Sequence, residues 1–155
     1  MSLLLITFPL GRGCINMGGR GTFAAGNKVA YTYEVDSQNY PDGKFEGVKV
    51  IVGAPGTNLH KLPESSHSSG AYLKMEPDGS FNMMRIYDKQ HVLRLEIAYH
   101  AEKQLGQGKV LHYHYYDERF SKNAEGDFGR STAIRITKKS RIYQRYKKFF
   151  KGVVL

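Results

Sequence analysis

Hydrophobic and polar residues alternate along several short segments of this chain, which is the pattern of half-buried β-strands. Turn residues separate these segments, with Pro77-Asp78-Gly79 the strongest turn signal and Asp88-Lys89-Gln90 a short hairpin loop. Residues 53–70 are rich in Gly, Pro and Ser and predict an extended loop. The alternation predicts strands at residues 28–35, 47–52, 71–76, 81–87, 91–99, 110–116 and 132–137.

Helical periodicity begins only near the C-terminus, after Ser140, which is a suitable N-cap. Apolar residues then follow at the spacing i, i+4, i+7 and i+8, which is one side of a helix. They are Ile142, Tyr146, Phe149 and Phe150. We therefore predict an α+β, mainly β fold, in which an antiparallel sheet of five or more strands is followed by a basic amphipathic helix at about residues 140–151.

The length of 155 residues suits one domain, which we place at residues 28–155. The Gly-rich residues 1–27 predict a flexible or docking N-terminal segment. A single cysteine, Cys14, excludes an internal disulfide framework. The apolar residues 3–10 are far fewer than the roughly 20 needed to cross a bilayer. No signal peptide is recognisable, so a cytoplasmic protein without a membrane span is expected.

The charge of the chain is concentrated at its C-terminal end. The formal net charge is +9, from 23 basic and 14 acidic residues, and no acidic residue follows Asp127. Nine cations lie beyond that position, so the first 127 residues are neutral overall. An amphipathic helix packed on a sheet naturally exposes some cations, and this segment has more than solubility requires.

Strand alternation predicts a polar face that carries three histidines. Successive side chains of a strand point to opposite faces, and a hairpin must bring the two apolar faces of its strands together. For the strands 91–99 and 110–116, this requirement gathers five residues on the second face. They are Arg94, Glu96, His100, His112 and His114. The alternative is a solvent-exposed polar face whose histidines have no function.

Two chemistries fit this group of residues. The first is metal-independent RNA cleavage without a cofactor, in which His100, His112 and His114 form the acid/base set. Arg94 would stabilise charge on the phosphate, and Glu96 completes the catalytic set. Imidazoles suit this role because their unperturbed pKa lies near 6.5. The second is metal binding by His112, His114 and a carboxylate, with His100 as a further ligand.

The pattern R-x-E-x-x-x-H, a Gly-containing gap and H-x-H, formed by Arg94, Glu96, His100, His112 and His114, resembles C-terminal domains of phage-associated and polymorphic toxins. The Tyr87-Asp88 pair matches the "YD" hairpin that precedes this pattern. The resemblance covers about residues 80–117, with Glu96 where an Asp is usual. It implies a ribonuclease of the barnase/EndoU/colicin/RelE type, encoded by a phage or bacterium, with an acidic immunity-type protein as partner.

A second resemblance is to the first metal-binding motif of cupins, G-x5-H-x-H-x3-4-E. The matching residues are Gly106, His112, His114 and Glu118. The resemblance implies a β-barrel whose metal ligands are His112, His114 and Glu118. No histidine follows His114, so the second cupin motif has no histidine ligand in this chain.

The C-terminal cations predict a surface that binds nucleic acid, with RNA as the expected partner. The predicted contacts are Arg135, Lys138, Lys139, Arg141, Arg145, Lys147 and Lys148. Tyr143 and Tyr146 would stack on unpaired bases. A basic amphipathic helix also suits an anionic membrane surface or an acidic protein. The alternative to an enzyme is therefore a non-catalytic phage or mobile-element module that binds nucleic acid or protein through this segment.

Overall fold

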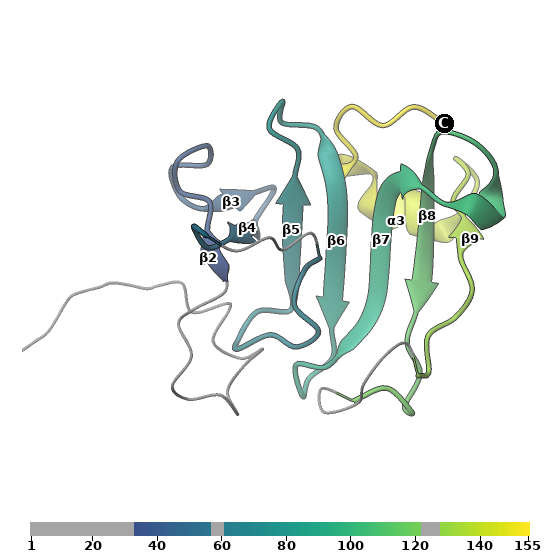
Figure 1. Cartoon of the computed structure of the whole chain (residues 1–155), viewed down its shortest axis with the longest axis horizontal. Coiled ribbons are helices and arrows are strands. Elements are labelled where there is room, and N and C mark those ends of the chain that lie inside the picture. The colour runs from purple at the N-terminus through teal and green to yellow at the C-terminus, as the bar shows by residue number, and fades with distance from the viewer. Residues whose placement is uncertain (1–32, 57–60, 122–127) are drawn as a thin grey trace, which may run out of the picture.

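The structure is a computed structural model that describes residues 33–56, 61–121 and 128–155. The predicted N-terminal segment 1–27, and residues 28–32 of the first predicted strand, lie outside the described residues. The described chain forms one sheet of eight strands with a short helical segment behind it (Figure 1). This confirms the predicted mainly β, mostly antiparallel fold with a C-terminal helix.

Seven of the eight strands overlap predicted segments, whereas β3 lies in a stretch that was predicted to be a polar turn. Their bounds are β2 (Tyr33–Val35), β3 (Lys44–Phe45), β4 (Val48–Gly53), β5 (Ala71–Met75), β6 (Phe81–Tyr87), β7 (Leu93–Ala101), β8 (Lys109–Tyr115) and β9 (Ile134–Arg135). The spatial order is β2-β4-β5-β6-β7-β8-β9, with β3 beside β4. Only β4 and β5 are parallel neighbours among these strands. In the described chain the path starts at β2 and ends at β9 without closing, so the sheet is open rather than a cupin-like barrel.

Alternation along the strands gives the sheet two different faces. One face, which we call the helix face, carries a core of Leu73, Met84, Ile97 and Leu111. The opposite face, which we call the histidine face, carries Tyr72, Met83, Ala98, His112 and His114. Each pair of neighbours such as Tyr72 and Leu73 therefore contributes one side chain to each core.

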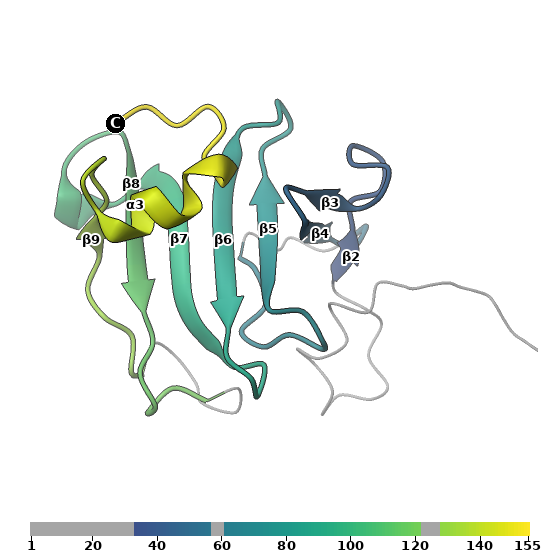
Figure 2. The ribbon, with the colours of Figure 1, turned by 180° about the vertical axis from the view of Figure 1, so that it is seen from behind.

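The C-terminal segment covers the helix face, where Figure 2 shows it in front of β7 and β8. It consists of α3 (Arg141–Tyr146) and the 3-10 turn η3 (Lys147–Phe149). Phe149 and Phe150 are buried in the core, and the Phe150 ring meets Phe81 edge-on at a centroid distance of 5.0 Å.

The α-helix is shorter than the predicted 140–151. The backbone carbonyl of Lys151 accepts a hydrogen bond from the amide of Phe81 at 2.8 Å, which ties the chain to β6. Gly152 then takes a positive φ of 78°, and the chain leaves the helical path. Within the described residues, no helix is long and apolar enough to cross a membrane.

The loop before β5 covers one end of the histidine face. Arg85 Nη1 donates to the carbonyl of Leu62 at 2.7 Å, and the Tyr87 hydroxyl donates to the carbonyl of Pro63 at 2.6 Å. Both contacts lie toward the end of β6. Since β7 runs antiparallel to β6, its last residues, including His100, lie away from this loop.

The packing of the C-terminal turn generates a stability prediction. Phe150→Ala should destabilise the fold by about 3 kcal/mol, because it removes a buried ring from the helix-face core. Phe128→Ala is the matched control, since Phe128 is 60% exposed and Phe150 only 8%. Urea unfolding followed by circular dichroism measures both changes. Equal effects of the two substitutions would contradict the docking of this segment on the sheet.

Candidate functional site

The pairing of β7 with β8 decides which side chains share the histidine face. The Cα partners are Glu96 with His114, Ala98 with His112, and His100 with Val110. Directly opposite residues of an antiparallel pair point to the same side. The predicted hairpin register is therefore confirmed, and His100, His112 and His114 project from one face of the sheet.

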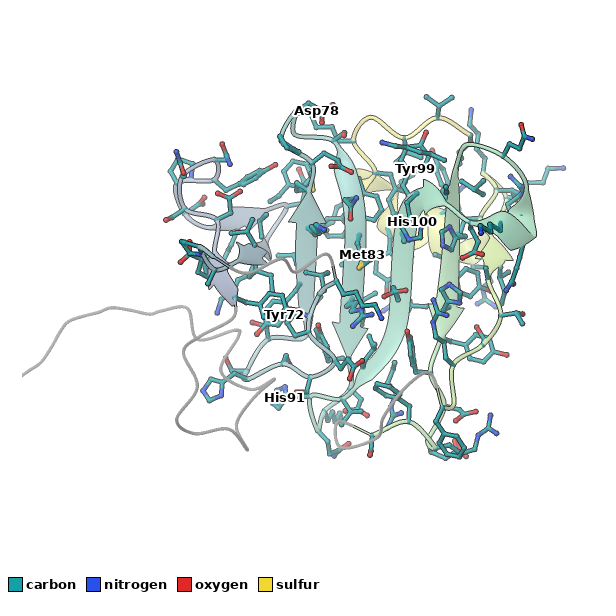
Figure 3. The ribbon with its side chains drawn as sticks, viewed as in Figure 1. Tyr72, Asp78, Met83, His91, Tyr99 and His100 are labelled. Carbon is teal, nitrogen blue, oxygen red and sulfur yellow. The ribbon has the colours of Figure 1, made fainter. Side chains whose placement is uncertain are left out.

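The three imidazole rings form a contiguous group. The ring centroids of His100 and His112 are 4.9 Å apart, with an interplanar angle of 82°. Those of His112 and His114 are 5.5 Å apart at 88°. His112 is fully buried and His114 is only 2% exposed, whereas His100 keeps partial exposure. Figure 3 labels His100 on the side of the sheet opposite α3.

Hydrogen bonds define the tautomers of the two buried histidines. His112 Nδ1 lies 2.8 Å from the carbonyl oxygen of Val110, and His114 Nδ1 lies 2.9 Å from that of Ser131. Since a carbonyl oxygen only accepts hydrogen bonds, each Nδ1 carries the ring hydrogen and each Nε2 keeps a lone pair. Both Nε2 atoms are buried, and neither has a hydrogen-bond partner among the described residues.

These two nitrogen atoms are energetically unusual. A buried polar atom without a partner costs about 1–3 kcal/mol, and native proteins keep few of them. The pKa of His112 lies below its ordinary value, chiefly because the ring is buried. The hydrogen bond to Val110 acts to raise this pKa, and the charges that His100 and His114 could carry act to lower it. The neutral ring is therefore favoured, which is the form that binds a metal ion.

Glu102 brings a carboxylate to the same place. It follows the last residue of β7 and caps the 3-10 turn η2 (Lys103–Leu105), where its side chain accepts from the amide of Gln104. Glu102 Oε2 lies 4.0 Å from His112 Nε2. The ligand atoms of Glu102, His112 and His114 all lie within 4.8 Å of one another. This is a two-histidine, one-carboxylate group with backbone carbonyls orienting both rings.

The carboxylate differs from the one predicted through the cupin motif. Glu118 is exposed in the loop after β8, and it joins no group of metal-ligating side chains within the described part of the chain. The motif spacing places it three residues beyond the end of β8 at Tyr115, where the strand no longer carries it toward His112. Glu102 was not identified as a ligand from the sequence. It is nevertheless the next residue, after His100, in the alternating series that begins Arg94, Glu96 and Ala98.

Glu96 lies opposite His114 but is held by two arginines. Arg85 Nη2 lies 2.5 Å from Glu96 Oε2, both side chains being buried, and Arg130 Nη2 lies 3.7 Å from Oε1. Burial is the largest single influence and acts to raise the pKa of Glu96. The charge and hydrogen bond of Arg85, together with the Arg130 charge, outweigh burial, so the pKa lies below its ordinary value. Glu96 is therefore an ionised partner of arginine rather than a free acid or base.

Arg94 shares the histidine face, but its guanidinium is taken up by other partners. Its Nε lies 2.8 Å from Asp88 Oδ2, and its Nη1 donates to the carbonyls of Asp117 and Phe120. Six positions along β7 separate it from His100, a span of about 20 Å. Its guanidinium therefore ties together the loops at the far end of the sheet. The structure does not support Arg94 as a phosphate clamp.

The C-terminal cations are divided between the two faces. All seven predicted nucleic-acid contacts are exposed. Arg135 of β9 is the Cα partner of His112 and belongs to the histidine face, where its guanidinium donates to the carbonyl of Leu105. The other six accompany α3 on or near the helix face (Figure 2): Lys138, Lys139, Arg141, Arg145, Lys147 and Lys148. Most of the predicted RNA-binding surface is thus separated from the histidines by the sheet.

A cavity of about 520 Å³ lies on the histidine face, and His100 is the one histidine of the three that lines it. Glu96 and His100 of β7, Tyr116 after β8 and Met83 of β6 are among its lining residues. Figure 3 labels Met83 and His100 on this face of the sheet. Burial and the nearby Glu96 charge raise the pKa of Tyr116 to about 12, so its hydroxyl stays protonated at neutral pH. Sequence reasoning missed this cavity, because its wall is assembled from distant segments.

Comparison with known proteins adds no relative. No family model matches the chain, and no significant match was found among curated proteins or solved structures. The resemblances to toxin domains and to the cupin motif therefore stay predictions.

The Arg85–Glu96 pair generates a prediction with a defined pH dependence. Glu96→Gln should destabilise the fold by about 3 kcal/mol or more at pH 7, because it leaves the buried Arg85 charge uncompensated. A lowered folded-state pKa means that ionised Glu96 stabilises the fold above its unfolded-state pKa, near 4.5. That stabilisation is lost as pH falls through the folded-state pKa, so the difference from wild type should shrink below pH 4.5.

Chemical denaturation at a series of pH values measures this difference. Arg119→Gln is the control, since it breaks an exposed pair with Asp117, and solvent-screened pairs of this kind contribute little to stability. A destabilisation by Glu96→Gln that does not change with pH would show that the ion pair is not its cause.

Proposed function

We propose that this protein binds one divalent transition-metal ion through His112, His114 and Glu102, and that the ion forms a hydrolytic centre. The observation that carries the proposal is the pair of buried Nε2 lone pairs, without hydrogen-bond partners in the described chain, beside a carboxylate. A metal ion would satisfy both nitrogen atoms at once. Within the described site, no protein group donates a hydrogen bond to either nitrogen atom.

The ligand set suits zinc. Zinc binds imidazole nitrogen and carboxylate oxygen at about 2.0–2.2 Å, which places tetrahedral ligand atoms roughly 3.3 Å apart. Small side-chain movements, chiefly of Glu102 at the edge of the site, would close the present separations of up to 4.8 Å. Iron(II) uses the same two-histidine, one-carboxylate set in oxygenases. We favour a hydrolytic zinc centre over an iron(II) oxygenase centre, because the cavity beside the site is cationic and suits an anionic substrate.

Three protein ligands leave a position open for water, as in catalytic zinc sites. His100 is placed to accept a proton from that water. Its Nδ1 lies 2.8 Å from the carbonyl of Ala101, so its Nε2 carries the lone pair, and its ring lines the cavity. A metal ion held there would supply an activated water for hydrolysis, and His100 would hold the proton of that water and pass it to the leaving group.

Metal titration tests the proposal. The metal-free protein should bind one equivalent of Zn²⁺, and Co²⁺ should give the visible absorption of a low-coordinate site. Glu102→Gln should weaken Zn²⁺ binding by about tenfold or more, because it removes the anionic ligand. His112→Ala should abolish stoichiometric binding.

Glu118→Gln is the matched control for Glu102→Gln and should leave the affinity for Zn²⁺ unchanged. His67→Ala plays the same part for His112→Ala, because His67 is exposed in the loop before β5. Calorimetry and cobalt spectra provide the measurements. Zinc binding that survives His112→Ala with unchanged stoichiometry would refute the metal centre.

Metal-independent RNA cleavage is the second candidate. It is favoured by the 4.9 Å contact between the His100 and His112 rings and by the cations of the adjoining cavity. In this case His100 would exchange protons with the substrate directly, because it is the most exposed of the three histidines. Full burial of His112 is the reason for placing this candidate second, since a buried ring cannot reach a ribose hydroxyl.

A cleavage assay on a single-stranded RNA oligonucleotide separates the two candidates. The metal centre predicts that excess chelator abolishes cleavage and that added Zn²⁺ restores it. His100→Ala should lower kcat by about 10²–10⁴-fold under either mechanism. Cleavage that continues at full rate in chelator would overturn the metal mechanism in favour of the second candidate.

A phage- or toxin-derived origin, RNA binding by the cations near α3 and an acidic immunity-type partner remain part of this proposal. Their support is the exposure of those cations and the absence of acidic residues after Asp127. Such a surface would bind RNA in a strongly salt-dependent manner.

A further inference from the structure

The cavity beside the histidines has an unusual charge. Its lining contains four cationic side chains and only two carboxylates. The cations are Lys61, Lys74, Arg85 and Arg130, and the carboxylates are Glu76 and Glu96. These six side chains alone give the lining an excess of two positive charges. Charged walls of one sign around a concave, partly dry site concentrate ligands of the opposite charge.

The contacts within the cavity show where this excess is located. Glu96 alone is approached by two guanidinium groups, at 2.5 Å for Arg85 and 3.7 Å for Arg130. The two guanidinium groups therefore converge on one carboxylate. Arg130 also donates through Nε to the Tyr116 hydroxyl at 3.0 Å, which fixes its orientation along the cavity wall.

Lys74 adds a further cation under desolvation. It belongs to β5 and is the Cα partner of Met83, so its side chain shares the histidine face. Burial lowers the pKa of Lys74, and the Glu76 carboxylate acts in the opposite direction. An anion in the cavity would offset the cost of keeping this ammonium charged away from water.

We propose that this cavity binds the phosphate group of a small phosphate ester, of about mononucleotide size, next to the metal centre. The inference rests on the proposed function and names its substrate class. A volume of about 520 Å³ lies within the range of small-molecule sites, about 300–1,000 Å³. The charge excess of two matches a phosphate dianion, for which guanidinium groups are the preferred partners.

The position of the cavity makes the phosphate a substrate rather than a distant effector. His100 lines the cavity, and its ring lies 4.9 Å from that of the metal ligand His112 (Figure 3). Glu96 lies directly across the strands from the second ligand, His114. A phosphate held by Arg130 and Lys74 would therefore lie on the same face of the sheet as the proposed metal ligands, next to His100.

Calorimetric titration of the full chain with inorganic phosphate and with adenosine monophosphate tests the inference. Both probes should bind saturably, and the nucleotide should bind more tightly because it also fills the cavity. Lys74→Gln should weaken both by about tenfold or more, through loss of a charge-assisted contact. Lys89→Gln is the control, because it removes an exposed cation of the β6–β7 hairpin loop that does not line the cavity, and it should leave both affinities unchanged.

The titrations are run with metal-free and with zinc-loaded protein, so that the two proposals fail separately. Stoichiometric zinc binding without saturable phosphate binding would overturn this inference and leave the metal centre intact. Phosphate binding that falls equally in Lys74→Gln and Lys89→Gln would also overturn it, as a general effect of charge. A tenfold loss of phosphate affinity in Lys74→Gln that the control does not show, and that Lys61→Gln in the loop reproduces, supports it. Should zinc fail to bind while this loss persists, the cavity site stands and the metal centre falls.

Discussion

The register between β7 and β8 is the constraint on which the rest of the site depends. Ile97 opposite Tyr113, and Tyr99 opposite Leu111, place the apolar side chains against the C-terminal segment. A slip by one residue would turn the whole set over. The histidines would then enter the apolar helix-face core, and leucine and tyrosine would line the cavity. The hydrophobic effect on one face therefore determines the chemistry on the other.

The buried polar groups on the histidine face differ in whether the protein supplies them with partners. Glu96 is buried but fully paired with arginine, so its burial is compensated within the protein. The Nε2 atoms of His112 and His114 are equally buried, and no described residue compensates them. Within a few ångströms the fold thus satisfies one set of polar atoms and leaves another without partners. This contrast is the physical reason for assigning the histidines, and not Glu96, to ligand binding.

The sequence alone predicted the strands and the histidine face, because alternation and turn residues are local signals. Phe81–Tyr87 has the bounds that its apolar pattern predicted. The parts that were missed depend on contacts between distant segments. Lys61, Lys74, Arg85 and Arg130 meet only because four segments fold around one cavity. Arg94 shares the predicted face, yet a loop carboxylate and two loop carbonyls take up its guanidinium, which no local pattern reveals.

The placement of the cations limits how a polymer could use this protein. The cavity and the exposed cations near α3 lie on opposite faces of one sheet, so a small ligand cannot contact both. A polymer could do so only by passing around the sheet edge formed by β9. Arg135 is an exposed cation of that edge strand, and it is the Cα partner of His112. Recognition of a small phosphate ester therefore needs only the histidine face, whereas an RNA strand would gain from the basic C-terminal segment by crossing the edge at Arg135.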